Sequence, residues 1–175
     1  FHVEPKSHGI FASYSKTLKQ RNYLIKTKKY KDIDFWNNEL IKYNASLYDY
    51  RNSYYSKLSE EFDNIIVQLK NTLPDLYTEV GSLEMSYYKG WNDDNYAEEL
   101  NNSFEKDTRV GYTTAGTHRS DILIKSNNKP VKESGSMSTL VLSCLLIFLA
   151  KSSVFHVKHG YKPVLLIDDL FFGID

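Results

Sequence analysis

The sequence predicts an α/β fold: a mixed sheet with helices, into which a long antiparallel helical arm is inserted. Three patterns lead to this class. Apolar residues recur in steps of three and four from Trp36 to Leu69, the spacing of one helical stripe. Apolar and polar residues alternate from Leu83 to Lys89, as in a strand with one buried face. Val164 to Ile167 is an all-aliphatic run, which is typical of a strand buried on both faces of a parallel sheet.

Composition places the chain among globular proteins. Of its 175 residues, 41% are hydrophobic, enough for a domain with its own core. The 22 basic and 22 acidic side chains cancel overall, but they are unevenly spread. Residues 1–31 hold eight bases and one acid, whereas residues 32–107 hold six bases and sixteen acids. The basic first segment is either a phosphate-attracting surface or simply the solvated face of a helix.

A single cysteine excludes a disulfide within the chain, which suits a reducing compartment. The first residues lack the apolar segment of a signal peptide. The most apolar run, Leu140–Ala150, is too short to span a bilayer. We therefore expect a cytoplasmic protein that has no membrane partner.

The first part of the chain, residues 1–75, is predicted to be a helical arm. Ser13 or Ser15 is a suitable N-cap for a first helix that ends at Lys29. A second helix begins at Asp32 or Asp34 and continues to Pro74, because no Gly or Pro interrupts it. At ~1.5 Å per residue it is roughly 55–60 Å long, more than a compact domain of this size usually holds. It is therefore expected to project as an arm.

Residues 76–175 are predicted to alternate between short strands and helices around tight turns. The predicted elements, in order, are a strand over Leu83–Lys89, a helix over Tyr96–Phe104 capped by Asp94, paired strands at Arg109–Thr113 and Asp121–Lys125, a turn at Ser126–Lys129, a helix over Met137–Val154 and the aliphatic strand.

Two adjacent acids, Asp168 and Asp169, follow the aliphatic strand. Ligands bind at the carboxyl ends of strands in open α/β sheets. In nucleotide-hydrolysing enzymes this Walker B layout gives the two acids separate roles. Asp168 would hold Mg²⁺ through water, and Asp169 would orient the attacking water as the catalytic residue. The alternative is a buried strand that ends in a polar turn.

Several short segments together resemble the RecF family of bacterial recombination-repair ATPases, which are related to SMC and Rad50 proteins. The first segment, FHVEP, is similar to a VHxxEP-like element, and GYTTAGTHRSD is similar to a YTxxGPHRxD run. The final one, LLIDD, matches a Walker B strand. In chain order the matching segments are Phe1–Pro5, Lys19–Asn22, Asp34–Leu40, Gly90–Trp91, Gly111–Asp121 and Leu165–Asp169.

This resemblance implies that residues 76–175 are part of an ABC-type ATPase head, with ATP and Mg²⁺ as cofactors and ATP bound between two protomers. The Walker A loop GxxxxGK[ST] does not occur in the chain. In the family it lies upstream of the matching segments. We therefore expect the chain by itself not to hydrolyse ATP, and its enzymatic status stays open.

The family's Ser-x-Gly-Gln signature, which faces the partner's nucleotide from a helix N-terminus, falls on Glu133, Ser134, Gly135 and Ser136. Glu133 departs from the pattern, because its charge would repel a γ-phosphate, and Ser136 is shorter than Gln. Asp175 ends a segment that resembles a degraded Glu-Leu-Asp turn and is assigned to the nucleotide site.

His118 and its neighbours Arg119 and Asp121 resemble a catalytic cluster, but a hydrogen-bonded turn is the simpler expectation. His156 and His159 lack a Cys or acid cluster, so we exclude zinc. Contacts with DNA phosphates are assigned to the basic residues of the first helix: Lys16, Lys19, Arg21, Lys26, Lys28 and Lys29.

The resemblance to the RecF family implies a function in ATP-dependent DNA binding, in recombinational repair and replication-gap processing. An ATP-dependent homodimer would bind single-strand/double-strand junctions and help RecO- and RecR-like partners load recombinase. Two alternatives remain open. One is a truncated remnant that binds no nucleotide and acts only as a DNA- or protein-interaction module. The other is an SMC-like structural head, for which one arm helix is short.

Overall fold

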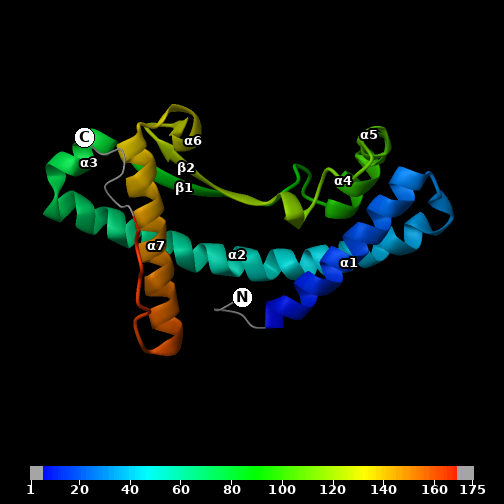
Figure 1. The fold of residues 1–175 in the computed structure, drawn as a ribbon, viewed down its shortest axis with the longest axis horizontal. Helices are drawn as coiled ribbons and strands as arrows, with labels where there is room; N and C mark the ends of the chain where they lie inside the picture. Colours follow the sequence, from blue (N-terminus) through cyan, green and yellow to red (C-terminus); the bar gives the residue numbers. More distant parts are fainter. Residues whose placement is uncertain (1–5, 169–175) are drawn as a thin grey trace. The chain divides into compact units, whose positions relative to one another are not determined.

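In the computed structural model, residues 6–168 are described, and they form helices and a small sheet (Figure 1). This agrees with the predicted α/β class with a helical arm. The elements, in chain order, are α1 (Lys6–Thr27), the 3-10 turn η1 (Tyr30–Asp32), α2 (Ile33–Thr72), α3 (Pro74–Val80), β1 (Leu83–Tyr88), α4 (Tyr96–Asn102), α5 (Phe104–Val110), the 3-10 turn η2 (Thr117–Arg119), β2 (Asp121–Ser126), β3 (Lys129–Pro130), α6 (Val131–Ser134) and α7 (Met137–His159).

The chain divides into two compact units, and each is discontinuous in sequence. The first unit contains Phe1–Ser53 and Tyr88–Asp121, and the second contains Tyr54–Tyr87 and Ile122–Asp175. The 40-residue helix α2 contributes residues to both units. The division into an arm over residues 1–75 and a partial head over residues 76–175 stays a prediction.

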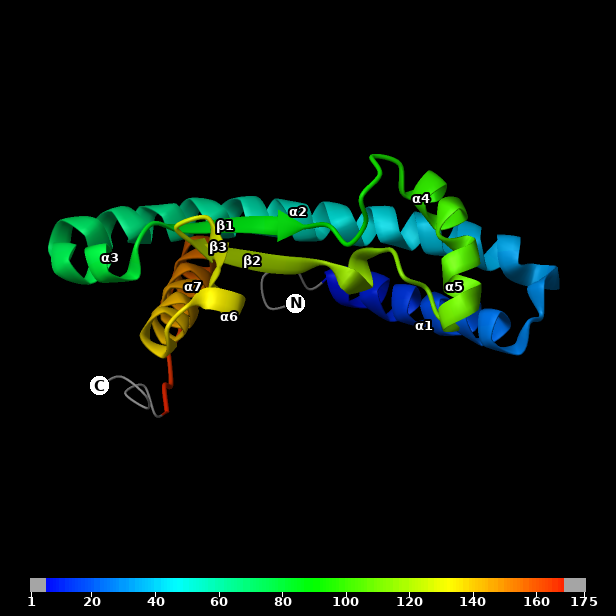
Figure 2. The ribbon, with the colours of Figure 1, turned by 90° about the horizontal axis from the view of Figure 1, so that it is seen from above.

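In the first unit, α1 and the start of α2 form a helical hairpin closed by η1 (Figures 1 and 2). The buried positions of α1 are Ser7, Tyr14, Thr17, Arg21 and Ile25, which lie at helical spacing along one side of the helix. Of these, Tyr14 belongs to the core of the first unit, which also contains Leu40, Leu47, Trp91, Tyr96, Leu100 and Ala115.

Helix α1 begins at Lys6, so the predicted caps at Ser13 and Ser15 are wrong. Ile10 and Phe11 lie in the additional turns and pack against the core of the first unit. The apolar contacts of these two residues favour helical structure upstream of the serines, since helices in proteins are stabilised chiefly by tertiary packing.

The predicted strand at Arg109–Thr113 is also wrong. Helix α4 is capped by the Asn95 side chain rather than by Asp94 and ends at Asn102, and α5 then runs to Val110. Gly111 terminates α5 in the left-handed conformation, with φ 85°, and its N–H donates to the Asp107 carbonyl. The end of a helix with a glycine C-cap and the loop after it therefore occupy the segment predicted as a strand beside a turn.

A buried ion pair joins α1 to α5. Arg21 Nη1 lies 2.7 Å from Asp107 Oδ2, and both side chains are 0% exposed. Arg21 Nη1 also donates to Thr113 Oγ1 at 2.6 Å, and its Nε donates to Asn37 Oδ1 at 2.7 Å. The second oxygen of Asp107 accepts from the backbone N–H and the hydroxyl of Thr114, at 2.8 and 2.7 Å. Hydrogen bonds thus compensate much of the cost of burying both charges.

In the second unit, the three strands are arranged in the order β1-β2-β3. β1 and β2 run in opposite directions (Figure 2), and β2 pairs antiparallel with β3, with Lys125 opposite Pro130. The predicted turn is confirmed: Asn127 and Asn128 have φ values of 49° and 65°, as a tight two-residue hairpin requires. Tyr55 of α2 donates to the Met85 carbonyl at 2.9 Å, which ties the helix to β1.

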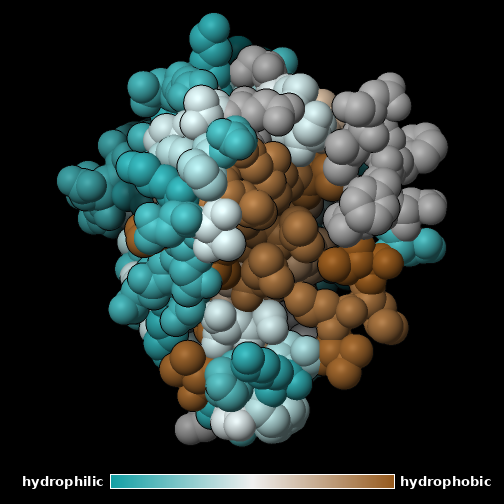
Figure 3. All heavy atoms as spheres, turned by 90° about the vertical axis from the view of Figure 1, so that its left-hand side faces the viewer, coloured by the Kyte–Doolittle hydropathy of each residue, from teal (hydrophilic) through white to brown (hydrophobic). Residues whose placement is uncertain are grey.

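Helix α7 starts where the sequence predicted but extends past Val154 to His159. Its length and composition would allow it to cross a membrane, and 22% of its most apolar window is buried in the described part of the chain. We expected the apolar run Leu140–Ala150 to be too short to span a bilayer, but the helix that contains it is long enough. One such helix is weak evidence for a membrane span, since an apolar helix that packs on other protein has the same composition. Apolar residues gather on the face shown in Figure 3. Exposed apolar residues of α7 include Met137, Phe148, Leu149 and Val157.

The first prediction concerns the buried ion pair. Asp107→Asn leaves the Arg21 charge buried without a counter-charge, so we expect the free energy of unfolding to fall by about 3 kcal/mol or more. Urea denaturation at pH 7 measures this loss. Glu105→Gln is the matched control, because Glu105 pairs with Arg109 at 3.7 Å on the surface, with side chains 92% and 75% exposed. The control should change stability by less than about 0.5 kcal/mol. Equal losses in the two variants would contradict the prediction.

Candidate functional site

The signature-like segment lies at the start of α7. Glu133 is exposed in α6, Gly135 is extended, and Ser136 is the N-cap residue of α7. Ser136 Oγ accepts from the Thr139 N–H at 3.1 Å and bonds the Thr139 hydroxyl at 2.9 Å. The backbone N–H groups of Met137 and Ser138 have no acceptor within the helix, because they precede its first repeating bond. An anion at this end would therefore meet backbone donors rather than a free Ser136 hydroxyl.

The segment Val164–Ile167 has no regular secondary structure, so the predicted buried parallel strand is wrong for the described residues. Val164 is 85% exposed and Leu166 is 94% exposed. A strand of this composition needs paired neighbours on both edges and cover on both faces. Strands β1, β2 and β3 form their own sheet and do not pair with it.

Asp168 is exposed at the end of this segment. Exposed carboxylate oxygens are ligands that Mg²⁺ prefers, so Asp168 fits the predicted role chemically. Asp169 and Asp175 lie outside the described residues, and so does the Phe1–Pro5 segment. The metal, catalytic and nucleotide assignments for these acids stay predictions.

Five of the six residues predicted to contact DNA are exposed on α1 or directly after it. They are Lys16, Lys19, Lys26, Lys28 and Lys29. Arg21 is the exception, and its assignment is corrected: its guanidinium is fully buried against Asp107 and cannot reach a phosphate. The sequence contained a usable signal, because Arg21 lies at helical spacing from the buried residues Tyr14 and Ile25.

The loop between α5 and β2, residues 111–120, is held by polar side chains from α1 and α2. Asn22 Oδ1 accepts from the Thr113 N–H at 2.8 Å, and Asn44 Oδ1 accepts from the Thr117 N–H at 2.8 Å. Arg51 donates to the Thr117 carbonyl and, at 2.6 Å, to the Ser120 hydroxyl. We did not predict these partners, because sequence patterns do not pair residues that lie 66 to 91 positions apart.

His118 is part of this same network, which confirms the predicted hydrogen-bonded turn. Its Nε2 lies 3.0 Å from the Thr113 carbonyl, to which it must donate. Its Nδ1 then accepts from the Tyr14 hydroxyl at 2.7 Å. Burial lowers the pKa of His118, because desolvation disfavours the charged imidazolium. His118 therefore holds the turn as a neutral ring.

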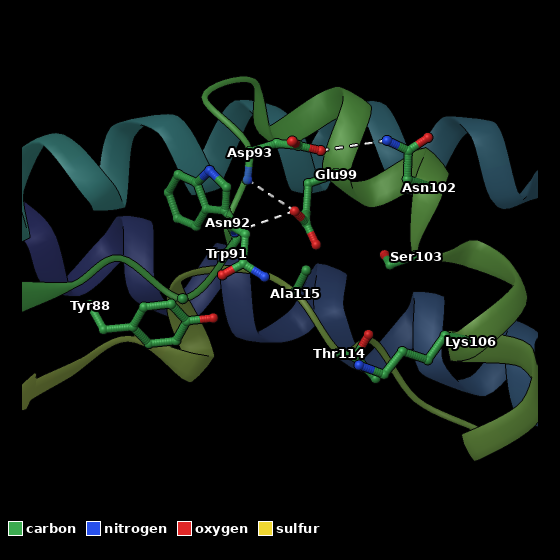
Figure 4. A pocket seen from close by; sticks show the side chains of 11 residues that line it. Tyr88, Trp91, Asn92, Asp93, Glu99, Asn102, Ser103, Lys106, Thr114 and Ala115 are labelled. Atoms are coloured by element: carbon green, nitrogen blue, oxygen red, sulfur yellow. Dashed lines mark hydrogen bonds between the residues drawn. The ribbon is translucent and has the colours of Figure 1, made fainter.

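A hollow of about 310 Å³ opens in the first unit between residues 88–93 and helices α4 and α5 (Figure 4). The side chains of Trp91 and Glu99 both line it. Glu99 Oε2 accepts from the N–H groups of Asn92 and Asp93, at 3.3 and 3.1 Å, and so fixes the loop before α4. The charged side chains that line the hollow are two acids, Asp93 and Glu99, and one base, Lys106. Their net negative charge disfavours binding of a phosphate group. A nucleotide site is therefore better sought at the start of α7.

Comparison with known sequences matches all of this chain to RecF proteins. The "DNA replication and repair protein RecF" of Aliivibrio fischeri strain MJ11 is 31% identical over 177 residues, and that of Vibrio vulnificus strain YJ016 is 29% identical over 177 residues. Each alignment covers 100% of this chain and 47% of the relative. No protein-family model matches.

The chain is RecF-like over its whole length. The predicted resemblance is thereby confirmed, and the RecF-like chain spans about half the length of the curated relatives it matches.

Solved structures show the same fold. The recombination mediator protein RecF in the RecFOR pathway, solved as RecF-ATP, superposes with a TM-score of 0.80 at 22% identity, over 99% of the RecF-like chain and 48% of the solved one. The RecF-ATPrS structure superposes with a TM-score of 0.79 at 23% identity. This match covers 97% of the RecF-like chain and 47% of the solved one. At such identities the likeness concerns the fold.

The second prediction follows from the neutral His118 of the RecF-like chain. Its folded pKa is lowered, so between that value and about 6.5 the unfolded chain binds more protons than the folded one. Stability is therefore highest above about pH 6.5 and falls as the pH drops towards the folded pKa. We expect His118→Gln to remove this part of the pH dependence, as measured by urea denaturation between pH 7.5 and 5. Parallel stability curves for the two proteins would show that the His118 pKa is the same in both states.

Proposed function

We propose that this chain is part of a RecF-type protein of DNA replication and recombinational repair, which acts in the cytoplasm. The supporting observation is the match to RecF proteins along all 175 residues, together with the RecF-like fold. In this proposal the protein binds single-strand/double-strand junctions as an ATP-dependent homodimer. RecO- and RecR-like proteins are its partners, and the complex promotes recombinase loading at gaps.

The chain would contribute one wall of an ATP site. The start of α7, with Glu133, Ser134, Gly135 and Ser136, would offer backbone N–H groups to the γ-phosphate of a nucleotide held by a second protomer. Asp168 would hold Mg²⁺ through water, and Asp169 would orient the attacking water, with Asp175 close to the nucleotide. Mg²⁺, when bound, neutralises charge that develops on the phosphates.

DNA phosphates would be bound by the exposed lysines of the first unit. Lys16, Lys19 and Lys26 lie on α1, and Lys28 and Lys29 follow it directly. Contacts of this kind are independent of base sequence and weaken steeply with salt. The ATP site would control dimerisation on DNA more than it would supply metabolic turnover.

A second candidate is a nucleotide-independent module that contacts only DNA or protein. Two observations favour it: Glu133 is exposed beside the start of α7, and the Ser136 hydroxyl is already engaged by Thr139. ATP binding separates the two candidates.

The third prediction concerns catalysis. We expect the 175-residue chain by itself to release no phosphate from ATP above background, because its sequence has no Walker A loop to hold the phosphates. A phosphate-release assay with Mg²⁺ measures this, and ATP titration followed by tryptophan fluorescence tests binding. Turnover that disappears in Asp168→Ala would refute the prediction. ATP binding in the absence of turnover would favour the RecF-type proposal over the nucleotide-independent module.

The fourth prediction concerns DNA. Reversing Lys26, Lys28 and Lys29 to Glu should weaken binding to gapped DNA and reduce the salt slope by about three, or roughly one per lost phosphate contact. The control reverses Lys57, Lys70 and Lys132, which are also exposed but lie outside the basic first segment. Both triples change the net charge equally. Fluorescence anisotropy at several salt concentrations measures both, and equal weakening would mean that net charge rather than this segment determines binding.

A further inference from the structure

The loop at residues 111–120 carries an exposed guanidinium that no site described so far uses. Arg119 is exposed, and its Cζ lies 5.2 Å from the centre of the Tyr112 ring, which is 44% exposed. The ion pairs found in the described part of the chain, Arg21–Asp107 and Arg109–Glu105, do not involve it. Stacking holds the plane of the guanidinium while its N–H edges stay directed to water.

The backbone that presents Arg119 is held on both sides. The His118 ring bonds Tyr14 and the Thr113 carbonyl, Arg51 bonds the Thr117 carbonyl, and the Arg119 N–H donates to the Gly116 carbonyl at 2.8 Å. Little conformational entropy of the loop therefore remains to be lost when Arg119 binds a ligand. An exposed arginine whose backbone is fixed and whose side chain is stacked is suited to bind an anion with both N–H edges.

The position of the loop indicates which anion. Asn22 holds Thr113, and on α1 it lies three residues after Lys19 and four before Lys26. Residues at these spacings occupy the same stripe of a helix, so both lysines flank the anchor of the loop. The loop that carries Tyr112 and Arg119 is thus anchored on the lysine-bearing stripe of α1, and it adds an exposed positive charge to the first unit. Such an extended positive surface with an aromatic ring suits a nucleic acid backbone, whose phosphates recur at regular spacing.

We propose that Arg119, stacked on Tyr112, is a phosphate-binding residue of the DNA surface formed with Lys19 and Lys26. The inference rests on the proposed DNA-binding function and deepens it by adding a specific contact outside α1. Arg119 binds a phosphodiester with its N–H edges, and Tyr112 keeps the guanidinium in place.

The test measures binding of the protein to a fluorescein-labelled 20-nucleotide oligo-dT and to a gapped duplex, by anisotropy at several salt concentrations. Arg119→Gln should weaken binding about tenfold, the value of one hydrogen-bonded charge, and reduce the salt slope by about one. Arg119→Lys should keep the slope but bind several-fold more weakly than the wild type, since lysine cannot bind bidentately. Tyr112→Leu should weaken binding with an unchanged slope, because it removes the stacking partner but no charge.

Arg109→Gln is the matched control, because Arg109 is an exposed arginine of α5 whose side chain is 75% exposed. It should leave affinity and slope unchanged, and all variants should keep the unfolding temperature of the wild type. If Arg119→Gln binds like the wild type while reversal of Lys26, Lys28 and Lys29 weakens binding, the inference is wrong and the proposed function stands. If neither change matters, or the protein binds neither DNA, the proposed function fails together with the inference.

Discussion

The buried pair of Arg21 and Asp107 is the interaction on which the first unit depends. It connects α1 with α5, and its hydrogen bonds reach Asn37 of α2 and the loop at Thr113 and Thr114. Two charges at 0% exposure are tolerated only because each is paired and hydrogen-bonded. The pair joins segments 86 residues apart, so it can form only when both have reached their native positions.

The same arrangement determines what the surface can offer. Because the Arg21 side chain is buried in its ion pair with Asp107, the accessible positive charge of α1 comes from its exposed lysines. The loop anchored by Asn22, Asn44 and Arg51 adds Arg119 to that charge. One unit therefore contains a buried arginine that is paired in the interior and an exposed arginine that is available to solvent.

The second unit shows how a strong sequence pattern remains unrealised without its partners. Val164–Ile167 has the composition of a buried parallel strand, but backbone pairing and cover on both faces are missing among the described residues. The exposed apolar side chains of α7 have the same physical origin, since an apolar helix needs another layer against which to pack. The RecF relatives are about twice as long as this chain, and the solved RecF structures share its fold.

The sequence by itself determined the features that depend on local rules. The length of α2, the strands β1 and β2, the Asn127-Asn128 hairpin and the start of α7 at Met137 all follow from helical spacing, residue alternation and turn chemistry. The resemblance to RecF likewise rested on short segments that sequence comparison bore out. Only the tertiary structure decided the rest. Arg21 was assigned to DNA because its charge is evident from the sequence and its buried partner is not. Arg109–Thr113 was assigned to a strand because it precedes a turn, and the sequence does not show that α5 continues to Val110. Burial and pairing depend on contacts between residues far apart in the chain, and no local pattern specifies those contacts.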